Sequence, residues 1–119
     1  MKPVLAALAV TLAFVSGGEA QQVSRGGGAL LRGLDKISGQ TTDMVVAVGQ
    51  SVDYGRLTVR LGECRFPSGD PSSDAFAQMT VTDRDQNVTL FSGWMIASSP
   101  ALSALDDARY DVWVISCQS

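Results

Sequence analysis

Alternation of apolar and polar residues runs through the chain from residue 29 onward and predicts short β-strands. The clearest segment follows Tyr54-Gly55, where Leu57, Val59 and Leu61 alternate with polar residues. Such alternation buries one face of a strand and leaves the other face in water. Gly62 ends the regular pattern and predicts a bulge. Comparable runs predict further strands over residues 29–34, 43–48, 76–81, 88–97 and 110–116.

Helical periodicity is almost absent from the same region. One candidate is residues 100–106, where Ser99 could cap the first turn, Pro100 suits its first position, and two leucines lie three residues apart. About seven short strands with turn residues between them are typical of an all-β domain. We therefore expect a small antiparallel β-sandwich or partly closed barrel, with one short helical turn near residues 100–106.

The N-terminal segment has the pattern of a secretory signal peptide. Lys2 precedes an apolar run of about 12 residues, shorter than the roughly 20 residues that a membrane-spanning helix needs. Small residues before Gln21 predict cleavage after Ala20 and export of the mature protein. A retained signal anchor is the alternative. Residues 21–29 are rich in glycine and predict a flexible leader, and residues 30–119 suffice for one domain.

Composition excludes several classes of function. The chain contains no histidine, which removes Ser-His-Asp and Cys-His catalysis and the common zinc sites. Its net charge is −3 and its basic residues are dispersed, so we expect no nucleic-acid partner.

Cys64 and Cys117 are the two cysteines of the chain, and both fall in predicted strands. Disulfides persist in exported proteins, so we predict a bridge between these residues. The alternative is two separately buried thiols.

Three segments of the chain resemble a known family. They are "LDKISGQTTDMVVAVGQSVDYGRLTVRLGECRFP", "DAFAQMTV" and "LFSGWMIASSPALSALDDARYDVWVISC". These segments resemble the domain of unknown function 2155 family, found in exported proteins of alphaproteobacteria, and both cysteines stand at the expected places. No enzymatic activity is established for that family. The resemblance implies a periplasmic β domain and, through neighbouring genes, a place as an accessory subunit on the periplasmic side of respiratory complex I.

Candidate catalytic and metal-binding residues are few. Asp106, Asp107 and Asp111 could supply a carboxylate pair for glycoside hydrolysis, but they fall at loop or strand-end positions that normally face water. Residues 83–87 are similar to part of a calcium loop, yet they lack its glycine and closing glutamate, so a hairpin turn is preferred. We predict no catalytic residue, no cofactor and no metal.

The two tryptophans have different expected places. Trp113 is predicted to fill the core beside the disulfide, whereas Trp94 suits either the core or a surface. An exposed Trp94 would favour a partner surface, because tryptophan is enriched among the residues that anchor interfaces.

The segment from residue 98 to residue 109 is longer than a hairpin needs. Leu102 and Leu105 beside Asp106 and Asp107 combine apolar anchors with an acidic rim, so we predict that these four residues and Trp94 form a partner-docking surface. Alternatively the leucines cap the open end of the sandwich. The expected function is a non-catalytic interaction module on a membrane protein complex. The alternative is a domain that binds small ligands or cell-envelope glycans through the loop at residues 67–74.

Overall fold

The computed structural model describes residues 22–119, and the predicted signal peptide over residues 1–20 lies outside them. Within this range the chain forms eight strands and one short 3-10 helix. The elements are β1 (Val23–Arg25), β2 (Gly28–Asp35), β3 (Thr41–Ala47), β4 (Ser51–Tyr54), β5 (Leu57–Pro67), β6 (Phe76–Asp83), β7 (Val88–Ile96), η1 (Pro100–Ser103) and β8 (Tyr110–Gln118).

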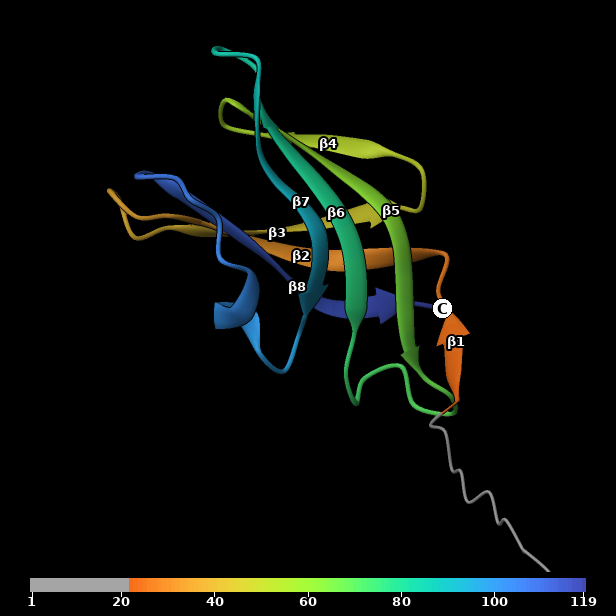
Figure 1. Cartoon of the computed structure of the whole chain (residues 1–119). Helices are drawn as coiled ribbons and strands as arrows, with labels where there is room; N and C mark the ends of the chain where they lie inside the picture. The colour runs from red at the N-terminus through yellow and green to blue at the C-terminus, as the bar shows by residue number, and fades with distance from the viewer. Residues whose placement is uncertain (1–21) are drawn as a thin grey trace, which may run out of the picture.

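The strands form two antiparallel sheets that pack face to face, which confirms the all-β fold. The five-stranded sheet has the order β1-β5-β6-β7, with β4 pairing the N-terminal half of β5. The three-stranded sheet has the order β3-β2-β8. In Figure 1 the long strands β5, β6 and β7 cross over β2 and β8, and η1 lies at the side of the sandwich, after β7.

The core lies between the two sheets and follows the alternation seen in the sequence. Leu57, Val59 and Leu61 of β5 are fully buried, as their pattern predicted. Antiparallel pairing brings them against the inward residues of β6 and of the opposite sheet. The largest fully buried side chains elsewhere are Leu31, Met79, Val81, Met95, Val112 and Val114.

A disulfide between Cys64 and Cys117 joins the two sheets, with an S–S distance of 2.08 Å. Each cysteine follows an irregularity in its strand. The register of β5 against β6 shifts between Leu61 and Glu63, which confirms the bulge predicted at Gly62. The register of β8 against β2 shifts as well, and leaves Ile115 as the extra residue. Since one extra residue reverses which face later side chains occupy, both cysteines point inward.

The expectation of a flexible leader over residues 21–29 is wrong for most of that segment. Val23–Arg25 forms β1 and pairs with the C-terminal end of β5. The Gly26 N–H then donates to the Cys64 carbonyl at 2.7 Å, and β2 begins at Gly28. These strand contacts are long-range and leave no periodic signal in a glycine-rich segment. The short strand β4 was not predicted either.

No helix among residues 22–119 has the length and apolar character needed to cross a membrane.

Candidate docking surface

The predicted docking residues of the 98–109 segment divide between surface and interior. Leu102 on η1 is 74% exposed, and Asp106 is also exposed. Leu105 is buried in the core, with 6% of its surface exposed. The Asp107 side chain is equally enclosed, at 6%. Leu105 and Asp107 were predicted to lie on the docking surface, but both side chains are buried and hold the segment against the sandwich.

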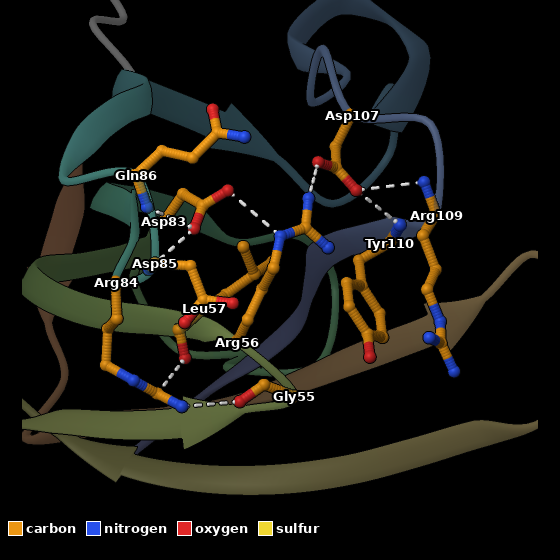
Figure 2. Close-up of polar contacts among 10 residues, drawn as sticks. All are labelled: Gly55, Arg56, Leu57, Asp83, Arg84, Asp85, Gln86, Asp107, Arg109 and Tyr110. Atoms are coloured by element: carbon orange, nitrogen blue, oxygen red, sulfur yellow. Dashed lines mark hydrogen bonds and ion pairs between the residues drawn. The ribbon is translucent and has the colours of Figure 1, made fainter.

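A cluster of ion pairs surrounds Asp107 at one end of the sandwich (Figure 2). The guanidinium of Arg56, in the β4–β5 turn, lies between two carboxylates and donates to both Asp83 and Asp107. The second oxygen of Asp107 accepts the backbone N–H groups of Arg109, at 2.9 Å, and Tyr110, at 2.7 Å. Burial favours a raised pKa for Asp107, but these N–H groups and Arg56 together lower that pKa below its usual value.

Asp83 organises the β6–β7 turn from the same cluster. One carboxylate oxygen accepts hydrogen bonds from the N–H groups of Asp85 and Gln86. The other accepts a hydrogen bond from Arg56 Nε at 2.9 Å. The Arg56 hydrogen bond lowers the pKa of Asp83 despite its burial. The carboxylate is thus occupied by protein donors, as expected for a hairpin turn. Among residues 22–119, no group of three or more carboxylate or cysteine side chains is placed to hold a metal ion.

Two tyrosines complete the cluster on its inner side. The rings of Tyr54 and Tyr110 meet edge to face at 5.1 Å, and the guanidinium groups of Arg56 and Arg109 lie 5.4 and 5.1 Å from the centre of the Tyr110 ring. Gly55 is required beside Tyr110, because its φ is +58° and an added Cβ would lie 2.5 Å from the ring.

Arg109 also ties the end of the 98–109 segment to β2. Its guanidinium donates to Asp35 at 2.9 Å, and this hydrogen bond lowers the pKa of Asp35 to about 2. Lys36 Nζ donates to the Asp107 carbonyl. Within the described chain, no buried side-chain nitrogen or oxygen lacks a partner. The cluster therefore consists of satisfied structural contacts, and Asp107 lacks the raised pKa that a general acid for glycoside hydrolysis needs.

Trp94 lies on the outer face of the five-stranded sheet and is 40% exposed. The Arg65 guanidinium lies 5.2 Å from the centre of a Trp94 ring, and Arg65 Nε donates to Glu63 at 2.7 Å. The Ser103 hydroxyl donates to the Trp94 carbonyl at 2.8 Å, which fixes the end of η1 beside β7. Trp94 is thus a surface residue, and its indole ring makes a cation–π contact with Arg65.

Trp113 is half-buried and packs against the margin of the core, so its predicted place between the two sheets beside the disulfide is wrong. Val112 and Val114 point inward, so Trp113 between them lies on the outer face of the three-stranded sheet. Counting alternate residues along β8 puts Trp113 on the same face as Cys117. The bulge at Ile115 breaks that count, and Cys117 points inward although Trp113 points outward.

The outer face of the three-stranded sheet carries an apolar patch that sequence reasoning missed. On β3, Val45 is 69% exposed and pairs across the sheet with Leu30. We call this patch the outer face; its apolar members are Leu30, Leu34, Val45, Trp113 and Ile115.

One ion pair stands within the outer face. Arg32 Nε and Nη2 donate to the two carboxylate oxygens of Asp43 at 2.8 and 3.1 Å, in a bidentate arrangement. Arg32 is also the cross-strand partner of Trp113. Because the pair neutralises itself, the centre of the outer face has no net charge.

A concavity of about 350 Å³ opens where η1 meets β8 beside the outer face. Trp113 and Asp111 of β8 line one part of it, and small apolar side chains line the rest: Pro100, Ala101 and Ala104. Trp113 and Asp111 of β8 therefore lie next to η1, at the border between the outer face and the concavity. A signal for them exists in the sequence, because "ALLRGL" and "VWVI" are apolar on both strand faces.

The loop at residues 67–74 is separate from this concavity. Its polar groups bond within the loop: the N–H and hydroxyl of Ser72 both donate to Asp70 Oδ1, and the Ser73 hydroxyl donates to the Asp70 carbonyl. Asp74 accepts the N–H and hydroxyl of Ser98. These groups stabilise the loop and are not directed toward a common ligand.

Comparison with known proteins places the described domain within a bacterial family. Residues 29–117 match the family described as uncharacterized protein conserved in bacteria (DUF2155). The chain is also similar to the uncharacterized protein RP359 of Rickettsia prowazekii (strain Madrid E), with 30% identity over 88 residues, 71% of this chain and 56% of the relative. The chain thus spans little more than half the length of that curated relative. No solved structure matches the chain.

Proposed function

The chain belongs to the DUF2155 family, and we propose that it is a non-catalytic periplasmic module that docks on a membrane protein complex through its outer face and η1. The observation that carries this proposal is the two-sided apolar character of β2 and β8. A strand that is covered on one side only normally alternates, whereas strands that are covered on both sides are apolar on both faces. With Leu30, Leu34 and Trp113 on their outer sides, β2 and β8 are apolar on both faces.

The partial exposure of the patch supports a protein partner, because Val45 is exposed and the other apolar members are half-buried. Monomeric soluble proteins rarely leave a large contiguous apolar surface open, and such surfaces mark interaction sites when polar residues surround them. The outer face has the Arg32–Asp43 pair within it and the exposed Leu102 and Asp106 on the neighbouring segment. This arrangement of apolar anchors with polar surroundings is typical of a docking interface.

The partner to be tested first is respiratory complex I, which the family resemblance implies. A tagged chain with its own N-terminal segment should be recovered from the periplasmic side of detergent-solubilised membranes together with subunits of one complex, identified by mass spectrometry. Recovery of complex I subunits supports the accessory-subunit role. Recovery of the tagged chain without any membrane protein contradicts docking.

Two substitutions on the proposed surface sharpen this experiment. Val45→Glu and Leu102→Glu place charges on residues that are 69% and 74% exposed, so the melting temperature should change little. Recovery of the partner should fall at least about tenfold, because charge is disfavoured in the centre of an interface. Val88→Glu is the matched control, since Val88 is 43% exposed on the other sheet. Equal loss with all three variants, or with none, contradicts the assigned surface.

The alternative function, binding of a small ligand or glycan, receives less support. That function calls for an enclosed site with converging polar groups. The loop at residues 67–74 has its polar groups engaged locally, and the concavity beside η1 has one aromatic and one carboxylate side chain.

A further inference from the structure

The concavity beside η1 contains one carboxylate that forms no ion pair with a cation among residues 22–119. Asp111 Oδ1 accepts the N–H of Val112 at 3.0 Å, and among the described residues Asp111 takes part in no salt bridge. The cations in neighbouring strand and turn positions are engaged elsewhere: Arg32 pairs with Asp43, Arg109 pairs with Asp35, and Lys36 Nζ donates to the Asp107 carbonyl. A negative charge beside an indole ring therefore faces the concavity unpaired.

We propose that this concavity binds the side chain of an arginine presented by the docking partner. The inference rests on the proposed function only for the source of that arginine, and it assigns the chemistry of one contact. The three-carbon stem of arginine fits the small apolar surface of Pro100, Ala101 and Ala104. The guanidinium then lies against Trp113 and donates to Asp111.

The lining residues favour a cation over a neutral apolar anchor. Trp113 offers the aromatic face that attracts cations most strongly. A carboxylate in the same concavity would be desolvated without compensation if a leucine or phenylalanine filled the space. With a cation present, the same carboxylate gains a charge-assisted hydrogen bond. The charge and shape of the site are thus complementary to a long cationic side chain.

Arginine suits the site better than lysine. Its planar guanidinium can stack on the indole ring of Trp113 and still direct N–H groups at Asp111, whereas an ammonium group acts as a point charge. The same chain already shows this geometry elsewhere, because Arg65 lies over Trp94 and bonds to Glu63. That trio holds an arginine between an indole and a carboxylate within one sheet face.

The test titrates the folded chain with N-acetyl-arginine amide and follows the indole N–H signals by NMR. The Trp94→Phe variant assigns the Trp113 signal. N-acetyl-citrulline amide has nearly the same shape without the charge, and N-acetyl-norleucine amide has an apolar chain alone. We expect the arginine derivative to shift the Trp113 signal and to bind about tenfold more tightly than citrulline. Norleucine should bind more weakly than arginine, and the lysine derivative should fall between arginine and citrulline.

Two conservative variants separate the site from general electrostatics. Asp111→Asn keeps an oxygen acceptor for Val112 and removes the charge, so arginine should bind no better than citrulline. Asp85→Asn removes an exposed charge in the β6–β7 turn, outside the concavity, and should leave arginine binding within about twofold. Equal binding of arginine and citrulline to the unmodified chain overturns the proposal. So does an Asp111→Asn variant that binds arginine as before.

Failure of this inference is distinct from failure of the docking proposal. If norleucine binds most tightly, the concavity takes an apolar anchor, while the loss of partner recovery in Val45→Glu can still be measured. If arginine binds as expected and no membrane complex is recovered, the site stands and the proposed partner is wrong.

Discussion

Asp106 and Asp107 are adjacent in the sequence and have opposite environments. Asp106 is exposed, whereas the Asp107 side chain is buried and contacts Arg56 and two backbone N–H groups. Removing one partner of a buried ion pair leaves the other charge unpaired. Asp107→Ala should therefore lower the free energy of unfolding by about 2 to 4 kcal/mol. Asp106→Ala should change it by less than about 0.5 kcal/mol.

Urea denaturation of both variants measures this contrast. The intact chain and the Asp106→Ala variant should have the same midpoint, and Asp107→Ala should have a lower one. Equal midpoints for the two aspartate variants would mean that the Arg56 cluster does not stabilise the end of the sandwich.

Asp35 makes stability depend on acid pH. Its pKa is lowered from 3.8 to about 2 in the folded chain, mainly by the hydrogen bond from Arg109. The unfolded chain therefore binds the proton first as pH falls. The stabilisation is fully present above about pH 4 and is lost as pH falls toward 2. The melting temperature should drop over this interval, and Asp83 and Asp107, whose pKa values are also lowered, act in the same direction.

The Asp35→Asn variant is the control for that pH dependence. Its melting temperature should be lower at neutral pH and should fall less between pH 4 and pH 2. A variant whose pH profile is parallel to that of the intact chain would show that Asp35 does not contribute to acid sensitivity.

At the level of elements, two bulges decide which faces the cysteines occupy. Without the extra residue at Gly62, the alternation of Leu57, Val59 and Leu61 would direct Cys64 outward. Deletion of Gly62 should therefore leave two free thiols in protein folded under oxidising conditions. Titration with a thiol reagent checks this result. Deletion of Ser72 in an exposed loop is the control and should keep the bridge.

A complete disulfide in the Gly62 deletion would show that β5 forms a compensating bulge elsewhere. Free thiols in both deletions would instead point to a general loss of folding, which the cooperativity of thermal unfolding distinguishes.

The strands that alternate strictly could be predicted from the sequence, because one face of each is buried and the other is solvated. The regular part of β5 and most of β3 belong to this group. β1 could not be predicted, since it consists of three residues held by pairing with β5, a contact between segments far apart in the chain. The bulge at Ile115 likewise depends on the register of β8 against β2, so counting alternate residues misplaced Trp113.

The sequence indicated the segment that carries part of the candidate site, but it could not show the contacts that this segment makes with distant residues. The composition of the 98–109 segment led to the docking prediction, which stays a prediction, and the structure shows Leu102 and Asp106 exposed. Sequence spacing could not show that Asp107 faces Arg56, because the two residues are 51 positions apart. The outer face of the three-stranded sheet was missed because residues 29–34 were interpreted as an alternating strand with one solvated face, although Leu30 and Leu34 lie on that face.

At the scale of the whole molecule, the 98–109 segment connects the two sheets at one side of the sandwich. Ser103 fastens the middle of the segment to β7. Asp107 and Arg109 fasten its end to the β4–β5 turn and to β2. These contacts hold η1 next to β8, where it completes the concavity beside the outer face. In the proposed docking, the polar cluster would act indirectly, by keeping the proposed surface in one shape before a partner binds.

The disulfide joins the same two sheets covalently across 53 positions of the chain. A loop of that length removes about 4 kcal/mol of conformational entropy from the unfolded chain on the chain-entropy model. Replacing both cysteines by alanine should therefore lower the free energy of unfolding by about 2 to 5 kcal/mol and make the domain sensitive to protease. Since β5 and β8 belong to different sheets, the loss should also loosen the concavity, and the Trp113 indole signal should broaden. Denaturation of the intact chain with and without reductant measures the same contribution. Coincident midpoints would show that the core and the Arg56 cluster hold the two sheets together without the bridge.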